Sequence, residues 1–294
     1  MAYAANGEYL VSGGAGGVRV WRVEDGKQMA TLEERVECLA VSNDGRWIAA
    51  GTAWGEVIVW DATTHEKVIS HREDYKDING VDFSPDSTRL VSASDKGTAS
   101  IWDIATRKRV QTLDVGDLVI AAKYSPQGDR IATASENSVR VWDSNDGRLL
   151  MDIKVKVTPW YNSGLLWSND NLFVMSDSNI KQFKASTGSM ISEWPVPASS
   201  NLSCIALPKN GEFIAYSAER SVTLWDTATH TQLGLFRHPQ DISSITVSPD
   251  DRFLAISGKE GKITINSLSR INVSILSRWI VVHTNNFLTP IIFP

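Results

Sequence analysis

Apolar and polar residues alternate along most of this chain in short runs, which is the pattern of half-buried β-strands. One such run recurs seven times and usually closes on Trp-Asp. The copies are VRVWRV at Trp21, VIVWDA at Trp60, ASIWDI at Trp102, VRVWDS at Trp142, IKQFKA at Phe183, VTLWDT at Trp225 and ITINSL at Asn266. Successive copies are separated by 39, 42, 40, 41, 42 and 41 residues. Self-similarity at roughly 40–45 residues, with four short strands in each unit, predicts the blades of a β-propeller.

The third repeat shows all four expected strands most clearly. Alternating runs cover residues 78–84, 89–94, 98–103 and 109–114, and we name these positions strands a to d from the centre outward. Gly, Asp and Pro, which favour turns, stand between them. We therefore predict an all-β fold, a single seven-bladed β-propeller of four-stranded antiparallel blades.

The first and last repeats are atypical. The chain begins inside the first strand a, so that strand is short, and strand d of the seventh repeat must come from residues 271–278 or 279–284. We expect the ring to close without the conventional closing strand from the N-terminus, although open β edges must still be covered. The predicted propeller covers residues 1–284. Residues 285–294 form a non-repeat tail, and an edge cover, an arm for a partner and a truncated reading frame remain open explanations for it.

Charge and the lack of targeting segments narrow the class of protein. The formal charge of −5 and the pI of about 5.6 argue against phosphate backbones and anionic membranes as partners. The N-terminus lacks the basic segment and apolar run of a secretory signal, and no apolar run reaches the roughly 18 residues of a membrane span. These features predict a soluble intracellular protein, cytoplasmic with the nucleus as the alternative.

The two cysteines, Cys38 and Cys204, each lie seven residues before a turn glycine in different repeats. Repeats that are four units apart on a ring are too distant for a disulfide. We expect both to be small buried side chains of inner strands.

Four Trp-Asp pairs in register and three Ser-Pro turns carry a resemblance to a known family. The pairs begin at Trp60, Trp102, Trp142 and Trp225, and the turns begin at Ser84, Ser125 and Ser248. On these residues the chain resembles the WD40 repeat (β-transducin-like) family over about residues 1–270. The resemblance implies a seven-bladed propeller that serves as a rigid platform for proteins or peptides and catalyses nothing.

The same family often carries four hydrogen-bonded side chains in a blade: a His before strand a, a Ser on strand b, an Asp in the b–c turn and the Trp. No repeat here has the full set. The third keeps Ser94 and Trp102 but lacks the His, and the seventh has His238 but Gly258 at the Ser position. We therefore expect tryptophan indoles without hydrogen-bond partners and blades held mainly by packing. Each unmade buried hydrogen bond would cost about 1–3 kcal/mol.

Catalysis would need a convergent nucleophile, base and orienting group. The five histidines form no pair at metal-ligand spacing, and no nucleophile elbow or phosphate-binding loop is present. Channel-facing residues near the starts of strands a, such as Arg35, Asp77 and Asp241, are too few and too mixed for a metal site. We therefore predict a protein that is not an enzyme and has no cofactor and no metal site.

The first candidate binding group lies in the b–c turns, six residues before each strand-c aromatic. In chain order these positions hold Ala15, Trp54, Lys96, Glu136, Asp177, Glu219 and Glu260. Four successive carboxylates would attract a basic segment. The alternative is that an acidic residue here is an ordinary turn residue of the family and contributes little.

The second candidate group is an aromatic pair, Trp160 and Tyr161, in the connection before the fifth repeat. Aromatic side chains with a polar tip are favoured interface anchors. The alternative is that Trp160 folds back over the fifth repeat, which has Phe183 in place of its tryptophan.

We therefore predict a non-catalytic protein–protein interaction scaffold that presents the end with the b–c turns to a protein or peptide. Trp54, Trp160 and Tyr161 would be anchors, and the four carboxylates Glu136, Asp177, Glu219 and Glu260 would set a preference for basic partners. Lys96 is a further candidate binding residue at the same turn position. Neither nucleic acid nor a membrane is an expected partner, and the oligomeric state is open. The alternative function is a sensor propeller cut from a larger signalling protein that resembles nucleotide-binding immune receptors.

Overall fold

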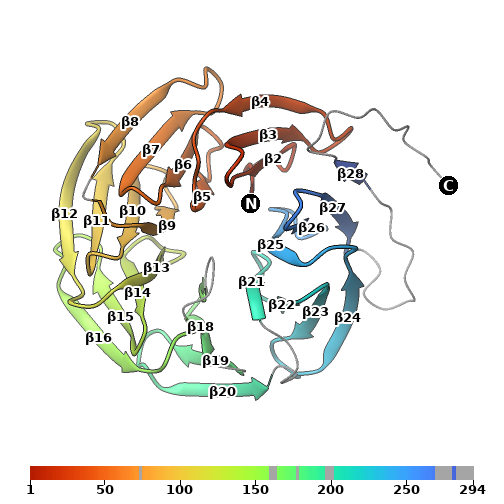
Figure 1. Ribbon diagram of the computed structural model, residues 1–294. Coiled ribbons are helices and arrows are strands. Elements are labelled where there is room, and N and C mark those ends of the chain that lie inside the picture. Colours follow the sequence, from red (N-terminus) through yellow and green to blue (C-terminus); the bar gives the residue numbers. More distant parts are fainter. Residues whose placement is uncertain (73–74, 159–163, 177–178, 196–201, 269–279, 283–294) are drawn as a thin grey trace.

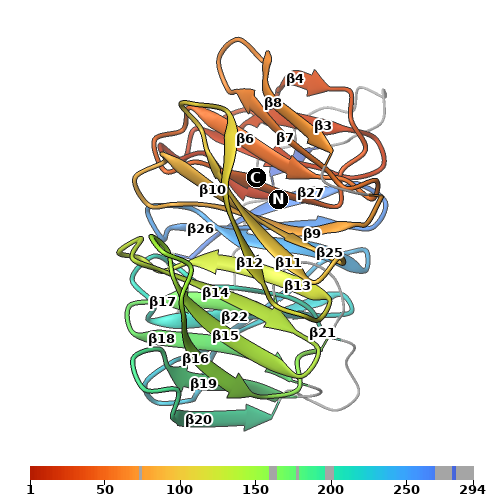
Figure 2. The ribbon, with the colours of Figure 1, turned by 90° about the vertical axis from the view of Figure 1, so that its left-hand side faces the viewer.

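Seven four-stranded antiparallel sheets stand around a common axis in the computed structural model, which describes residues 1–72, 75–158, 164–176, 179–195, 202–268 and 280–282 (Figure 1). Each sheet is one blade and is built from four consecutive strands. Seen from the side, the blades pack against one another around the ring (Figure 2). The predicted all-β seven-bladed propeller is confirmed, and the described residues include no helix.

The strands follow the chain in blade order, from the innermost to the outermost strand of each blade. Blades 1 and 2 are β1 Ala2–Tyr3, β2 Tyr9–Ser12, β3 Val18–Arg22 and β4 Gln28–Leu32, then β5 Cys38–Val41, β6 Trp47–Gly51, β7 Glu56–Asp61 and β8 Lys67–Arg72. Blades 3 and 4 are β9 Ile78–Phe83, β10 Arg89–Ser94, β11 Thr98–Asp103 and β12 Lys108–Asp114, then β13 Val119–Tyr124, β14 Arg130–Ser135, β15 Ser138–Asp143 and β16 Leu149–Lys154. Blades 5 and 6 are β17 Leu165–Ser168, β18 Asn171–Ser176, β19 Asn179–Lys184 and β20 Met190–Pro195, then β21 Leu202–Ala206, β22 Phe213–Ala218, β23 Ser221–Asp226 and β24 Gln232–Arg237. Blade 7 is β25 Ile242–Val247, β26 Phe253–Gly258, β27 Ile263–Ser267 and β28 Ile280–Val282.

The outermost strand of blade 7 settles one of the two predicted alternatives. β28 lies within residues 279–284 and not within 271–278, and it pairs with Ile263, Thr264 and Ile265 of β27. The predicted tail, residues 285–294, lies outside the described residues. The tail and the domain boundary before it stay predictions.

The hydrophobic core is divided into seven clusters, one between each pair of neighbouring blades. Between blades 2 and 3, for example, Val57, Val59 and Val81 pack with Trp102. The repeated strand-c aromatic belongs to the cluster shared with the preceding blade: Trp60 with blade 1, Trp102 with blade 2, Trp142 with blade 3, Phe183 with blade 4, Trp225 with blade 5 and Trp21 with blade 7. A buried Trp removes roughly 150–250 Å² from water, about 4–6 kcal/mol at 25 cal/mol per Å². The sequence repeat is therefore the repeat of an interface between blades.

The ring closes by packing between blades 7 and 1. The cluster at this interface consists of Tyr3, Leu10, Trp21, Ala255, Ile263 and Ile265. Phe253 and Val23 pack against it, and the Met1 nitrogen donates a hydrogen bond to Ser244 Oγ at 3.1 Å. Because every described sheet contains only consecutive strands, the predicted closure without an exchanged strand is confirmed, as is the short first strand.

Four tryptophan indoles find a hydrogen-bond acceptor within their own blade, so the prediction of indoles without partners is wrong for these blades. The Nε1 donors and acceptors are Trp21 to Ser12 Oγ at 2.8 Å, Trp102 to Ser92 Oγ at 3.0 Å, Trp142 to Thr133 Oγ1 at 2.8 Å and Trp225 to Tyr216 OH at 3.2 Å. The acceptor in blade 3 is Ser92 and not Ser94. Ser92 lies opposite Ser100, which shares a face of β11 with Trp102 because side chains alternate along a strand.

The Asp of each Trp-Asp pair has a different task, which is to close the turn between strands c and d. Asp61 Oδ1 accepts hydrogen bonds from the backbone N–H groups of Thr63 and Thr64, both at 2.8 Å. Asp226 binds the N–H groups of the equivalent turn in blade 6 at 2.9 and 2.7 Å. These backbone bonds, from Thr64 first, hold the pKa of the Asp61 carboxyl below its ordinary value.

The indole hydrogen bond of blade 3 should be measurable in a double-mutant cycle. We expect Trp102→Phe and Ser92→Ala each to lower the free energy of unfolding, and the two changes to be coupled by about 1 kcal/mol, because the bond is buried. Chemical denaturation of the wild type, both single variants and the double variant measures this coupling. Fully additive effects would show that the bond contributes nothing beyond packing.

Candidate functional site

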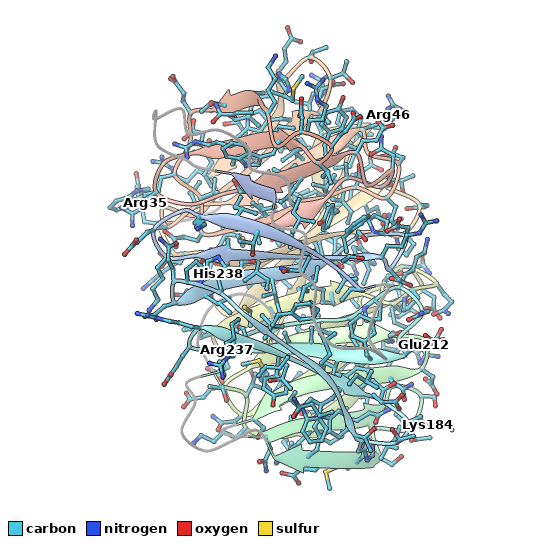
Figure 3. All side chains as sticks on the ribbon, turned by 90° about the vertical axis from the view of Figure 1, so that its right-hand side faces the viewer. Arg35, Arg46, Lys184, Glu212, Arg237 and His238 are labelled. Carbon is cyan, nitrogen blue, oxygen red and sulfur yellow. The ribbon has the colours of Figure 1, made fainter. Side chains whose placement is uncertain are left out.

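The turns of the propeller lie at two opposite ends of its axis. The b–c turns share one end, here called the b–c end, with the connections that lead from strand d into the next blade. In Figure 3, Arg35, Arg237 and His238 lie at the b–c end, whereas Arg46, Glu212 and Lys184 lie at the opposite end. A partner at the b–c end therefore meets two sets of connecting segments at once.

The described b–c turn candidates lie at this end with exposed side chains: Trp54, Lys96, Glu136, Glu219 and Glu260. Their turns are tied by backbone hydrogen bonds to the next blade or to the connection that leads into it. The Glu136 carbonyl accepts from Val157 N at 2.7 Å, and the Glu219 carbonyl accepts from Ile242 N at 2.7 Å. These bonds hold the turns in fixed positions relative to the neighbouring blade.

The other three candidates, Trp160, Tyr161 and Asp177, lie outside the described residues. Their part in binding, and the alternative that Trp160 covers the fifth blade, stay predictions. At the described strand-c position of that blade, Phe183 is itself buried and packs in the cluster between blades 4 and 5.

Basic side chains interrupt the predicted acidic arc in blades 6 and 7. Arg220 Nε lies 3.1 Å from Asp241 Oδ1, and Lys259 Nζ lies 3.9 Å from Asp241 Oδ2. Glu260 Oε2 accepts a hydrogen bond from Gln240 Nε2 at 2.6 Å. Exposed ion pairs contribute little stability, but neighbouring cations weaken the attraction for a basic partner in this part of the ring.

Exposed apolar side chains gather instead at the b–c end of blades 2 to 4. Trp54 exposes 66% of its surface, Tyr75 exposes 75% and Leu118 exposes 40%. Tyr75 and Leu118 were not identified from the sequence as candidate binding residues. The only signal in the sequence was that each is a large apolar residue among charged residues in a connection between blades. Exposed apolar side chains that lie together mark interaction sites, and aromatic side chains are common interface anchors.

Backbone hydrogen bonds place these three side chains on adjoining segments. The carbonyl of Thr52, in the turn that carries Trp54, accepts from Ile78 N at 3.1 Å, where the Tyr75 connection enters blade 3. The Gly97 carbonyl accepts from Val115 N at 2.9 Å, which joins the b–c turn of blade 3 to the connection that carries Leu118. Asp95 N donates to the Asp77 carbonyl at 3.0 Å, which joins the Tyr75 connection to the b–c turn of blade 3. Trp54, Tyr75 and Leu118 therefore lie along one exposed arc, here called the anchor arc.

A buried histidine without its full set of partners lies at the same end of blade 7. His238 is 3% exposed, its Nδ1 lies 3.0 Å from the Gln240 carbonyl oxygen, and its Nε2 has no partner among the described residues. Gly258 leaves room for the imidazole of His238, since a Cβ at Gly258 would lie 2.7 Å from His238 Cε1. Burial lowers the pKa of the imidazole below its ordinary value of 6.5.

The central channel is a cavity with a volume of about 1350 Å³, and strands a form much of its wall. Asp82 Oδ1 and Lys123 Nζ form an ion pair on this wall at 2.9 Å. Arg35, Asp77 and Asp241, which were expected to face the channel, do not belong to its described lining, because they lie at the rim of the b–c end. In the described part of the chain, no three His, Cys, Asp or Glu side chains are grouped so that they could hold a metal ion.

Both cysteines are buried in innermost strands, as predicted, and neither is in a disulfide. Burial raises the pKa of the Cys38 thiol to about 12 and that of Cys204 to about 11, so neither is a thiolate nucleophile near neutral pH. Nothing helical in the described residues has the length and hydropathy that a bilayer crossing requires.

Comparison with known proteins gives a family match and several relatives. The chain matches the family model of the IFT122 first beta-propeller over residues 1–267. WD repeat-containing protein 18 of Danio rerio is 21% identical over 300 aligned positions, which cover 90% of this chain and 68% of the relative. Small ribosomal subunit protein RACK1y of Oryza sativa subsp. japonica is 30% identical over 148 residues, which cover 47% of this chain and 44% of the relative. The chain thus matches less than half the length of this rice protein.

A solved structure shares the fold. A chain in a structure titled "Crystal Structure of Mitotic Checkpoint Complex" superposes with a TM-score of 0.78 at 17% sequence identity. The superposition covers 91% of this chain and 88% of that chain. At this identity, the likeness concerns the seven-bladed architecture.

Gly258 should tolerate no larger residue, including the serine of the family set. We expect Gly258→Ser to lower the free energy of unfolding by about 1–3 kcal/mol, because its Cβ would lie within 2.8 Å of Gln240 and His238. Gly14→Ser is the control, since a Cβ at Gly14 meets nothing within 4 Å. Denaturation midpoints measure both, and a Gly258→Ser protein as stable as the control would contradict the expectation.

His238 should make stability depend on pH in mildly acidic solution. The folded protein favours the neutral imidazole, so the unfolded chain binds more protons below pH 6.5. The free energy of unfolding should therefore fall as the pH drops from about 6.5 towards the folded pKa. Thermal unfolding at pH 7.5 and 5.5 tests this, and His238→Gln should lose less stability than the wild type between these two values. Equal losses would remove His238 as the cause.

Proposed function

We propose a function that proceeds from one premise: the chain belongs to the WD40-repeat family of the IFT122 first beta-propeller. One relative is named as a WD repeat-containing protein, and one solved neighbour comes from an assembly of proteins, the mitotic checkpoint complex. The chain is accordingly a protein-interaction scaffold. The proposed detail is that it acts without catalysis and presents its b–c end to a protein or peptide.

The anchor arc is the observation that carries this proposal. Trp54, Tyr75 and Leu118 expose apolar surface on neighbouring segments, and backbone hydrogen bonds join these turns and connections to one another. An anchor that is already in place loses little conformational entropy on binding. A rigid platform with three exposed apolar side chains supports binding of a partner segment rather than transformation of a small molecule.

The partner is proposed to be a protein or peptide segment with basic residues beside an apolar side chain. Exposed carboxylates border the arc at Asp117 and Glu136, and the guanidinium of Arg72 already lies 5.5 Å from the centre of the Tyr75 ring. Aromatic faces and carboxylates both favour cations. Glu219 and Glu260 extend the same preference around the end, although the cations beside them weaken it.

The predicted alternative, a sensor propeller from an immune-receptor-like protein, has no support in the family match or in the relatives reported above. The predicted place of action remains inside the cell, in keeping with relatives that are named as small ribosomal subunit proteins.

The scaffold proposal predicts that binding depends on the anchor arc. We expect Trp54→Ser with Tyr75→Ser to reduce the capture of specific partner proteins from lysate by at least about tenfold, because buried aromatic anchors carry about 2 kcal/mol or more each. Quantitative mass spectrometry of wild-type and variant captures measures the loss. Met29→Ser is the control, because Met29 is also exposed but lies on β4 at the outer rim. Equal capture by the anchor variant and the wild type would contradict the proposal.

A further inference from the structure

Strand d carries a β-bulge at the same place in six blades. In each of these blades, one residue of strand d pairs with the strand-c aromatic, and the next residue of strand d is left out of the pairing register. The residues at the bulge are Met29, Val68, Val110, Leu150, Ile191 and Leu233. All six are apolar. Because a bulge interrupts the ladder of an edge strand, these strands are poor templates for the addition of another strand.

Blades 4 and 5 differ from the others at the position just before the bulge. There the residue that pairs with the strand-c aromatic is Leu149 in blade 4 and Met190 in blade 5. Blades 1, 2, 3 and 6 have Gln28, Lys67, Arg109 and Gln232 at this position. Two neighbouring blades therefore carry an apolar pair where the other four carry a polar residue before the bulge. Because the other four blades form the same fold with a polar residue at this position, the fold does not require an apolar residue there.

The resulting apolar surface, here called the rim patch, consists of Leu149, Leu150, Met190 and Ile191. Each side chain exposes between 41% and 56% of its surface. β16 and β20 are successive outer strands in both views of the ring (Figures 1 and 2). The turn before β20 packs on β16, since a Cβ at Gly188 would lie 2.7 Å from Met151 Sδ. The four side chains are therefore close enough to be covered by one partner element.

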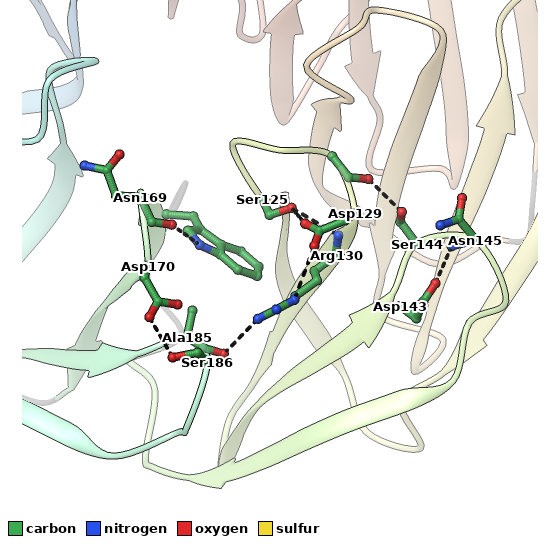
Figure 4. A network of polar contacts seen from close by, with 12 residues as sticks. Ser125, Asp129, Arg130, Asp143, Ser144, Asn145, Asn169, Asp170, Ala185 and Ser186 are labelled. Atoms are coloured by element: carbon green, nitrogen blue, oxygen red, sulfur yellow. Dashed lines mark hydrogen bonds and ion pairs between the residues drawn. The ribbon is translucent and has the colours of Figure 1, made fainter.

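Polar contacts fix the turn that joins the two halves of the rim patch. Arg130 of blade 4 donates from its guanidinium to the Ala185 carbonyl at 3.5 Å, and Ser186 Oγ donates to Asp170 Oδ2 at 2.6 Å (Figure 4). Lys184 N donates to Ser189 O at 2.9 Å across the turn. These contacts attach the turn to both blades, so the patch is presented on a fixed surface.

The charge around the rim patch differs from the charge of the whole protein. The c–d turns of blades 3 to 5 contain five basic residues, Arg107, Lys108, Arg109, Arg148 and Lys184, and three acidic ones, Asp103, Asp143 and Asp146. The c–d turns of blades 1, 2 and 6 contain three basic and five acidic residues: Arg22, Lys27, Lys67, Glu24, Asp25, Asp61, Glu66 and Asp226. The net charge is thus +2 over the turns of blades 3 to 5 and −2 over the other three turns. The excess comes from the turn of blade 3, on one side of the patch, because Arg148 and Lys184 balance Asp143 and Asp146 in the turns of blades 4 and 5.

The acidic residues on the two outer strands themselves are already engaged. Asp152 of β16 lies 3.2 Å from Arg140 Nε and 2.8 Å from Lys154 Nζ. Glu193 of β20 lies 3.8 Å from Lys181 Nζ. These pairs reduce the repulsion that an acidic partner would otherwise meet on this side of the ring.

We propose that the rim patch is a second docking surface, independent of the b–c end, for an acidic amphipathic helix of another protein. The bulges disfavour a strand as the occupant, so contact must be made through side chains. Apolar side chains at equivalent positions on the outer strands of two neighbouring blades suit the apolar face of a helix, with anchors spaced at i, i+3, i+4 and i+7. The basic c–d turn of blade 3, on one side of the patch, together with Arg148 and Lys184 favours carboxylates on the polar face of that helix.

Two 18-residue model helices with identical leucine positions test this proposal, one with a glutamate polar face and one with a lysine polar face. Fluorescence anisotropy at about 0.1 M salt should show the glutamate helix binding the wild type at least about tenfold more tightly than the lysine helix. Leu149→Gln with Met190→Gln should weaken this binding at least about tenfold. These changes introduce the residue that blades 1 and 6 already carry, so the fold is retained.

Two further variants make the outcome decisive. Met29→Gln, an exposed bulge residue in blade 1, should leave binding unchanged, and Arg148→Glu with Lys184→Glu should weaken it and reduce its salt dependence. Equal affinity for the two helices, or an equal loss with Met29→Gln, would overturn the proposal. If the glutamate helix does not bind, two other results would also overturn the proposal. One is self-association of the protein in sedimentation that the patch mutations abolish, and the other is binding to phosphatidylserine vesicles that the same mutations abolish. Because the anchor arc is intact in every variant, failure here would leave the proposed function untouched.

Discussion

The packing of one strand-c aromatic against the preceding blade is the interaction on which the rest of the structure depends. A four-stranded sheet has two faces to cover, and a single blade can cover neither alone. Trp102 and its counterparts fill the wedge between sheets, which decides both the spacing of the blades and their arrangement in a ring. The hydrogen bond from the indole to strand b then orients each ring without carrying most of the energy.

Because this packing is repeated, the ring can close without exchanging a strand. Blade 7 has Asn266 at the aromatic position, yet Leu254 and Leu268 of that blade join the core that it shares with blade 6. The last interface is made by Trp21 of blade 1 against Ile263 and Ile265 of blade 7. Closure is therefore one more copy of the interface between blades.

A ring that is held by its internal wedges leaves its ends and its rim available for other tasks. The turns carry little of the core, so residues there can vary without loss of the fold. Trp54 takes a b–c position that is charged in blades 3 to 7, and Leu149 and Met190 take a rim position that is polar in blades 1, 2, 3 and 6. The apolar surface at the b–c end lies beside carboxylates, whereas the apolar surface at the rim lies beside cations. The two proposals therefore assign partners of opposite charge to these two surfaces.

The sequence alone determined the fold class, the number of blades, their strand order and the burial of both cysteines. It could do so because the alternation and the period of about 41 residues are local properties, and each repeat reports them again. It did not determine the acceptor of Trp102, since Ser92 and Ser94 both lie on strand b and only the register decides between them. It also missed Tyr75 and Leu118, and it did not separate Glu219 and Glu260 from the cations beside them. Which side chains meet at an end or on the rim depends on how neighbouring blades are placed, and that placement exists only after the ring has closed.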